Sequence, residues 1–213
     1  MKIAKIHAYR NDASRVIVYF TDRTYLTVDA CEAERLHLKP GMELDATLLP
    51  ALSEESRRNA ARIKAVQITG KRSLSTGELK KKLLERGIAA PDADAAIAWM
   101  VELGALNDAE YAAMLVRHYR GRGFGTTRVR EELRKRALKK EQIEEALSEP
   151  CDQSAEILKF LQQKTRGRML TPDIKRKLTA ALLRRGHGYE EIRAGFSALD
   201  VEIEEEAWQE QSE

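Results

Sequence analysis

The residues best suited to chemistry are arginines and lysines that gather in two short segments, and the chemistry is the binding of polyanions. Residues 117–140 hold ten Lys or Arg against two acidic residues, and residues 159–185 hold nine against Asp173. Forked guanidinium donors match phosphate and carboxylate oxygens, and neutralised phosphates release counterions. The alternative is a solvated helix face balanced by acids elsewhere. The local excess of positive charge favours the binding interpretation.

The candidate binding residues lie in a glycine-rich loop and on the helices around it. Glycines in the loop 121–125 bring backbone amides close to an anion, or they simply end a helix, and both interpretations stay open. We expect Phe124 to anchor this loop rather than to stack on a base. On the following helix Arg130 and Arg134 share one face. The predicted partner-binding and DNA-binding residues are Arg117, Arg120, Arg122, Arg128, Arg130, Arg134, Lys135, Arg136, Lys175, Arg176, Arg184 and Arg185.

Patterns typical of catalysis are missing from the sequence. Gly70-Lys71-Arg72 resembles the end of a phosphate-binding loop, but Ala65 stands where the first glycine belongs. The four histidines lack metal-ligand spacing, and His187 is expected to be a surface residue. Asp92 and Asp94 are expected on a helix surface, in capping and solvation roles. We therefore predict a protein that is not an enzyme and that needs no metal and no cofactor.

Composition indicates a reduced, cytoplasmic protein. Of 213 residues, 43% are hydrophobic but only 6% are aromatic, which suits a helical core of aliphatic side chains. The chain has no run of twenty uncharged residues and no apolar leader, so no membrane segment or secretion signal is expected. Cys31 and Cys151 form no disulfide framework. The net charge of +3 hides an asymmetry, because residues 200–213 carry seven acidic residues and no Lys or Arg.

The elements that must position these charges are mostly helices. KIAKIHAY, RVIVYF and TYLTVD predict three short strands, and ACEAERLHL predicts a short helix. Residues 1–52 are therefore expected to form a small β-rich (α+β) domain. Beyond them, apolar residues recur at three- and four-residue spacings between capping residues and glycines. This pattern predicts nine further helices, near 53–70, 75–86, 91–103, 107–120, 126–137, 139–149, 152–166, 171–185 and 188–199.

These nine helices repeat in threes. GELKKKLLERGIAAPDADAAI aligns without a gap with TRVREELRKRALKKEQIEEAL and with the matching part of IKRKLTAALLRRGHGYEEIRAGF. In this alignment Ile88, Leu138 and His187 are equivalent. A repeat of about 50 residues indicates a tandem array, in which each unit buries surface within itself and against its neighbours. The predicted fold is therefore mainly α, with three-helix repeats at 53–106, 107–150 and 151–199 and an acidic tail at 200–213.

Four segments together resemble the RecX family of regulatory proteins of bacterial recombination. They are GELKKKLLERG, LGALNDAEYA at 103–112, RGRGFGTTRVREEL at 120–133 and KLTAALLRRGHGYEEIRAGF. Two departures from the family pattern are Ala105, where a larger residue is usual, and Ala137, where glycine is usual. Neither position is one of the predicted binding residues.

The resemblance implies a partner and a mode of action. RecX proteins bind the RecA recombinase as its filament on single-stranded DNA, and they inhibit its ATPase and strand-exchange activities. They act in homologous recombination, DNA repair and the SOS response without chemistry of their own. We accordingly expect a cytoplasmic monomer that also contacts single-stranded DNA without sequence preference.

A sequence-nonspecific DNA-binding or architectural protein is the alternative. A base-reading helix would expose Asn, Gln, Arg or Ser at its start. In repeats one and three the second helix begins instead with small, acidic or apolar residues, at 76–78 and 172–174, and only repeat two begins with basic ones. Sequence-specific reading is therefore not expected, and a nuclease has no supporting constellation.

Overall fold

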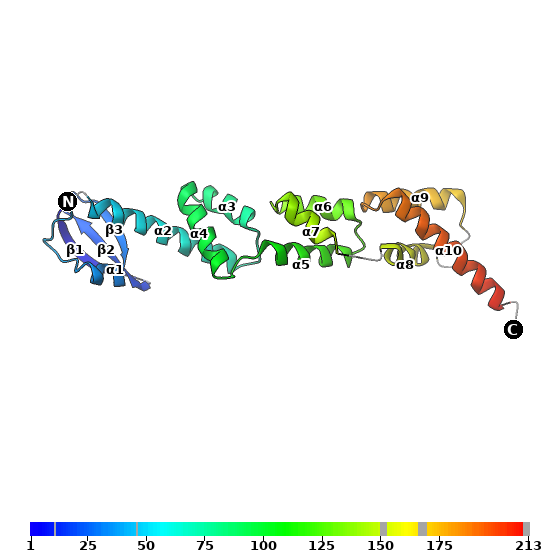
Figure 1. Cartoon of the computed structure of the whole chain (residues 1–213), viewed down its shortest axis with the longest axis horizontal. Coiled ribbons are helices and arrows are strands. Elements are labelled where there is room, and N and C mark those ends of the chain that lie inside the picture. The colour runs from blue at the N-terminus through cyan, green and yellow to red at the C-terminus, as the bar shows by residue number, and fades with distance from the viewer. Residues whose placement is uncertain (11, 46, 150–152, 166–169, 211–213) are drawn as a thin grey trace. The chain divides into compact units, whose positions relative to one another are not determined.

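The chain folds as two units, Met1–Leu106 and Asn107–Glu213. The computed structural model describes residues 1–10, 12–45, 47–149, 153–165 and 170–210, with side chains up to residue 200. Within these residues it contains one sheet and ten helices (Figure 1). The prediction of a mainly α chain with a small N-terminal sheet is therefore confirmed. Nowhere in the described chain does a helix combine the length and apolarity that a membrane crossing requires.

The first unit begins with an antiparallel sheet of three strands in the order β1 (Ile3–Tyr9), β2 (Asp12–Phe20) and β3 (Tyr25–Asp29). Because side chains alternate along a strand, one face carries the buried residues Ile3, Val18 and Val28. The short helix α1 (Ala30–Arg35) and the first turns of α2 (Leu48–Thr69) pack against this face. The three strands and the short helix were predicted from the sequence.

The first three-helix repeat consists of α2, α3 (Thr76–Glu85) and α4 (Ala90–Glu102). Its core is aliphatic, with Leu79 and Leu83 fully buried. A capping box starts α3, since Ser75 accepts a 3.0 Å hydrogen bond from the amide of Glu78 while its own amide donates to the Glu78 carboxylate. Helix α2 begins five residues before the predicted start and so crosses the proposed boundary at residue 52. The domain bounds stay a proposal.

The second unit contains the other six helices. They are α5 (Asp108–Arg120), α6 (Thr126–Lys135) and α7 (Lys140–Leu147), followed by α8 (Gln153–Thr165), α9 (Pro172–Arg184) and α10 (Tyr189–Glu210). Each set of three encloses its own core. The repeat spacing has a packing cause, because the equivalent residues Leu83, Leu133 and Leu182 are all buried. The predicted boundary near 150 and the end of the acidic tail, residues 211–213, lie outside the described residues.

Candidate polyanion-binding surface

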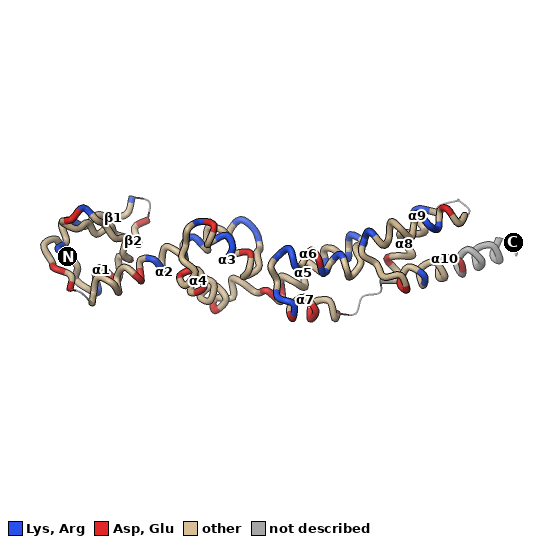
Figure 2. The backbone as a smooth tube through the Cα atoms, turned by 90° about the horizontal axis from the view of Figure 1, so that it is seen from above, with Lys and Arg blue, Asp and Glu red and all other residues tan. Residues whose placement is uncertain are grey.

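The predicted site residues all lie in the second unit, on α5, α6, α9 and their adjoining turns. Figure 2 shows lysines and arginines along α6 and α9. Four of the predicted arginines are exposed and, among the described residues, have no carboxylate partner: Arg117, Arg122, Arg134 and Arg184. Within the described chain none of these four guanidinium groups is held in an ion pair, so each can receive an anion, although the charge of Arg134 contributes to lowering the pKa of Glu144.

Other predicted residues are paired with carboxylates. Arg130 makes a bidentate ion pair with Glu144 of α7, at 2.9 Å from Nε and 3.0 Å from Nη2. This hydrogen bonding raises the pKa of Arg130 and lowers the pKa of Glu144. On the surface of α9, Arg176 lies 3.1 Å from Asp173. Neighbouring acids balance the charges of Arg130 and Arg176, so the binding of a polyanion at these two positions stays a prediction.

Glu132 holds two of the predicted cations on one side of α6. Lys135 Nζ lies 2.9 Å from its carboxylate and Arg128 Nη2 lies 3.0 Å from it. The hydrogen bond from Lys135, followed by the charges of Arg128 and Arg136, lowers the pKa of Glu132. Arg136 is half-buried at the C-terminal end of α6. These side chains stay at the surface, but their charge is partly neutralised.

Arg120 binds main-chain carbonyl groups of its own chain. Its Nη1 donates to the carbonyl oxygen of Glu149 and its Nη2 donates to that of Leu147, each at 3.1 Å. These carbonyls end α7, so the guanidinium caps that helix and ties it to α5. The Arg120 Nε is buried without a partner among the described residues. The binding of a polyanion by Arg120 stays a prediction, and this geometry disfavours it because both ends of the guanidinium fork already donate to carbonyl oxygens of the protein.

The glycine loop packs against the next repeat instead of forming an anion cradle. The amide of Gly125 donates to the Arg185 carbonyl at 2.9 Å, and the amide of Thr127 donates to the Gly186 carbonyl at 3.2 Å. A Cβ on Gly125 would lie 2.3 Å from the Gly186 oxygen, so glycine is required by this approach. Phe124 packs on Tyr119 with ring centroids 6.0 Å apart, as predicted for an anchor.

His187 is buried, contrary to the sequence expectation of a surface residue. It is 6% exposed, and its Nε2 lies 3.2 Å from the carbonyl oxygen of Gly123. Its Nδ1 has no hydrogen-bond partner within the described residues. The repeat alignment contained the signal, because His187 is equivalent to Leu138, which is also buried. His187 thus helps to hold the glycine loop against the turn between α9 and α10.

Three of the cations lie over aromatic rings. The guanidinium carbon of Arg185 is 4.6 Å from the Phe160 centroid, and Lys175 Nζ is 5.1 Å from the Phe196 centroid. Arg122 lies 5.8 Å from the ring of Phe124. Rings place long side chains without neutralising them, so these cations keep their charge for a ligand.

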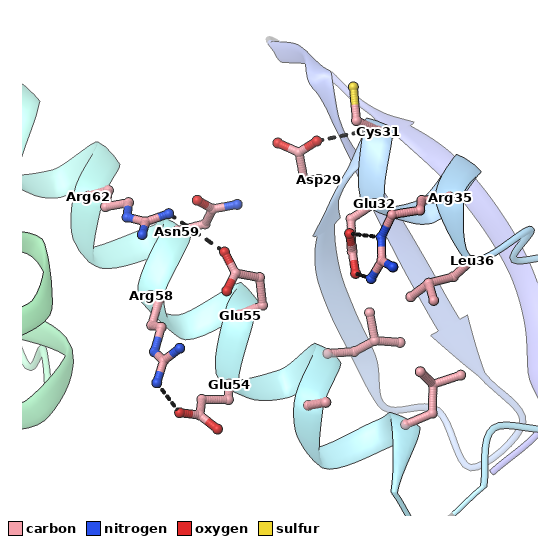
Figure 3. A pocket seen from close by; sticks show the side chains of 13 residues that line it. Asp29, Cys31, Glu32, Arg35, Leu36, Glu54, Glu55, Arg58, Asn59 and Arg62 are labelled. Atoms are coloured by element: carbon pink, nitrogen blue, oxygen red, sulfur yellow. Dashed lines mark hydrogen bonds and ion pairs between the residues drawn. The ribbon is translucent and has the colours of Figure 1, made fainter. Parts of the chain in front are cut away.

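One pocket lies in the first unit and offers few free groups. Its volume is about 650 Å³, and it opens between α1 and α2 (Figure 3). All of its lining side chains that carry a charge, except Asp29, pair with one another: Arg58 with Glu54, Arg62 with Glu55, and Arg35 with Glu32. Such mutual pairing leaves little to hold a charged ligand.

Asp92 and Asp94, which the sequence predicts on a helix surface, both have a basic partner. Asp92 is buried and lies 3.4 Å from Arg57, which corrects the expectation that it is a surface residue. Asp94 lies 2.7 Å from Lys80. Across the described residues, no three His, Cys, Asp or Glu side chains gather as a metal site would require.

The fold is that of a helical-repeat protein with a small N-terminal sheet. The family model described as "RecX, second three-helix domain" matches residues 107–147. The regulatory protein RecX of Vibrio vulnificus is 30% identical over 135 residues, which cover 62% of this chain and 88% of the relative. That of Bacillus subtilis is 26% identical over 209 residues, which cover 96% of this chain and 79% of the relative. The chain belongs to the RecX family of regulatory proteins.

Solved structures share the fold. A crystal structure of a regulatory protein RecX superposes with a TM-score of 0.69 at 20% identity and covers 90% of this chain and 98% of its own. The crystal structure of RecX from Lactobacillus salivarius gives a TM-score of 0.63 at 19% identity, with 68% and 97% covered. These likenesses support the fold of strands and helical repeats.

Proposed function

We propose that this protein binds the RecA recombinase filament on single-stranded DNA and inhibits its ATPase and strand-exchange activities. The observation that carries the proposal is the set of exposed arginines without carboxylate partners among the described residues, Arg117, Arg122, Arg134 and Arg184. Membership of the RecX family supports the choice of partner. We propose that the protein acts by binding alone and carries out no reaction of its own, as its membership of a family of regulatory proteins suggests.

The junction between the start of α6 and the end of α9 supports a single contact that spans both helices. Backbone hydrogen bonds from Gly125 and Thr127 fix the start of α6 to the end of α9. Arg134 on α6 and Arg184 on α9 therefore belong to one body, and a rigid array of charges loses less entropy on binding than separate mobile segments do. Such a surface suits a long, regularly charged ligand. From the sequence composition we also propose that the protein is cytoplasmic, and we propose that it acts as a monomer.

The test is inhibition of DNA-dependent ATP hydrolysis by preformed RecA filaments. The double variant Arg122→Glu/Arg134→Glu should require at least about tenfold more protein for half-inhibition, because each reversal adds repulsion at a phosphate or carboxylate. The matched control is Lys81→Glu/Arg86→Glu, which makes the same change in net charge at exposed residues of the first unit. If both double variants are folded and inhibit equally well, the exposed arginines of the second unit do not contact the filament.

A sequence-nonspecific DNA-binding or architectural protein is the second candidate. The exposed arginines favour it as much as they favour filament binding, since phosphate contacts carry no sequence information. Affinity for single-stranded DNA without RecA, measured on several sequences and at several salt concentrations, separates the two. Tight binding to naked DNA without any effect on the filament ATPase would favour this candidate.

A further inference from the structure

The three-stranded sheet of the first unit has one face that is not part of its core. Ile3, Ile6, Val18 and Val28 point into the core. The pairing register shifts between Ile3 and Lys5, and beyond that shift the residues that alternate with Ile6, Val18 and Val28 form the opposite face. This outer face consists of Lys5, His7, Tyr9, Arg15, Ile17, Tyr19, Tyr25 and Thr27. Strand register places Lys5, Tyr19 and Tyr25 side by side in one row across β1, β2 and β3. Polar, aromatic and cationic side chains therefore meet on one surface.

The aromatic rings of the outer face form a cluster around Tyr19. The Tyr25 centroid lies 6.1 Å from the Tyr19 centroid, and the His7 ring meets Tyr19 edge-on at 5.9 Å. Tyr25 is 67% exposed and Tyr9 is 39% exposed. Exposed rings on a rigid sheet present flat surfaces to solvent at low entropic cost, which is what a stacking ligand needs.

Cations lie directly beside these rings. Lys5 Nζ is 4.8 Å from the Tyr19 centroid, and the Arg15 guanidinium is 5.2 Å from the Tyr9 centroid. Neither cation makes an ion pair within the described residues. Arg15 also lines a cavity whose wall includes Arg62, itself 5.5 Å from the Trp99 ring. The pattern of ring beside cation thus continues past the edge of the sheet.

The acids near this face are engaged locally. The Asp29 carboxylate accepts a 2.9 Å hydrogen bond from the amide of Cys31 at the start of α1. The Asp12 carboxylate accepts hydrogen bonds from the amide and the hydroxyl of Ser14, at 3.0 and 2.5 Å. Because both acids lie at one end of the sheet, the row of Lys5, Tyr19 and Tyr25 remains cationic and aromatic.

We propose that the outer face of the N-terminal sheet binds single-stranded DNA, with bases stacked on Tyr19 and Tyr25 and phosphates beside Lys5 and Arg15. Every base has a π face, so stacking of this kind tolerates any sequence, and adjacent cations hold the backbone. A duplex keeps its bases stacked inside and cannot use the rings. This site is additional to the arginines of the second unit. The choice of DNA over RNA as the ligand rests on the function proposed above. The stacking of bases on the tyrosine rings is argued from the geometry of the sheet alone.

The experiment measures fluorescence anisotropy of a labelled oligothymidylate with the full chain and no recombinase. The double variant Tyr19→Leu/Tyr25→Leu keeps an apolar side chain but removes the rings, and its dissociation constant should rise about tenfold or more. The matched control Tyr19→Phe/Tyr25→Phe keeps the rings and should bind like the parent. Affinity for duplex DNA should be the same for all three proteins.

Each outcome decides the proposal. Unchanged affinity in the leucine variant overturns it, and so does an equal loss in the phenylalanine variant, because stacking does not need the hydroxyls. If the leucine double variant unfolds by circular dichroism, Tyr25→Leu alone replaces it, since that side chain is largely in solvent. Tighter binding of oligouridylate than of oligothymidylate would refute the assignment to DNA.

A protein ligand for the sheet would be recognised by a different result. In that case the leucine variant would bind oligothymidylate normally yet inhibit RecA filaments less, and the stacking proposal would fail. The proposed filament function is tested separately through Arg122→Glu/Arg134→Glu. If Arg122→Glu/Arg134→Glu inhibits RecA filaments as well as its control does, the filament proposal fails. The leucine and phenylalanine variants are still expected to differ in their affinity for oligothymidylate, so the two proposals can fail independently.

Discussion

The amide nitrogen of Gly125 lies 2.9 Å from the carbonyl oxygen of Arg185, and this hydrogen bond joins the second repeat to the third. It has a neighbour in the 3.2 Å bond from Thr127 to Gly186. Donors at the N-terminal end of α6 thereby satisfy acceptors at the C-terminal end of α9. Both helix ends would otherwise leave backbone groups unpaired, and their opposite partial charges attract.

Replacing Gly125 with alanine should separate these helix ends. The new Cβ would meet the Gly186 backbone at 2.3 and 2.4 Å, so the two turns must move apart. We expect a loss of about 1–3 kcal/mol in the free energy of unfolding, measured by urea denaturation. The control is Gly188→Ala, whose Cβ would make an ordinary 3.5 Å contact with Glu191. Equal stability of the two variants would contradict this account of the junction.

Arg120→Lys should destabilise the protein without weakening an anion contact. A lysine ammonium group lacks the forked donors that let the guanidinium reach the Leu147 and Glu149 carbonyl oxygens together, so at least one of these oxygens loses its hydrogen bond. The expected cost is about 1–2 kcal/mol in urea denaturation. Arg117→Lys, one turn earlier on the exposed side of α5, should cost nothing measurable. If Arg120→Lys instead keeps its stability but loses filament inhibition, the structural role is wrong.

Helix positions could be predicted because their signals are local. Ser75 and Asn107 cap the helices that follow them, as the sequence indicates. The two clear differences arise where local signals are weak. Helix α2 starts early because Asp45 accepts a hydrogen bond from the amide of Leu48 and because Leu52 packs into the sheet core. Helix α10 runs past the predicted end at residue 199 to Glu210, in a stretch without glycine or proline.

The candidate site was predictable in charge but not in pairing. Counting residues locates the cations, whereas their partners depend on how helices pack. Arg130 meets Glu144 from the next helix, and Arg120 meets carbonyls at and beyond the end of α7. The glycine loop was open to two interpretations, and packing of Gly125 on the third repeat decided against an anion cradle. Only His187 carried a usable signal, in the repeat alignment.

Salt dependence should distinguish free from paired arginines. For single strands, each phosphate contact contributes about 0.7 to the slope of log affinity against log salt. Arg122→Gln and Arg134→Gln should each lower the slope for oligothymidylate by about that amount. Arg130→Gln should lower it less, because Glu144 already balances that guanidinium. Identical slopes for Arg134→Gln and Arg130→Gln would show that pairing with Glu144 does not matter to the ligand.

Acidification should weaken the link between α6 and α7. Arg130 holds the pKa of Glu144 below its ordinary value, so the stabilisation is present above the unfolded pKa of about 4.3 and is lost as pH falls through the lower folded pKa. The melting temperature of the parent should therefore fall more steeply below about pH 5 than that of Arg130→Gln. Arg184→Gln, which removes a cation without a carboxylate partner among the described residues, should keep the parent's slope.

Removal of the acidic tail should tighten DNA binding at low salt. Residues 200–213 contain seven acids and no Lys or Arg, so their deletion leaves a net charge of +10 on the chain. Leu199 is buried in the core of the last repeat, and a cut after it keeps that core complete. If the tail competes with DNA for the cationic surface, the gain in oligothymidylate affinity should shrink as salt screens the competition.

A full-length variant with the seven acids changed to Gln or Asn should bind as tightly as the truncated chain. If both proteins bind oligothymidylate only as tightly as the parent does, the tail does not compete with DNA. If only the truncated chain binds more tightly, the tail acts through its size and not through its charge.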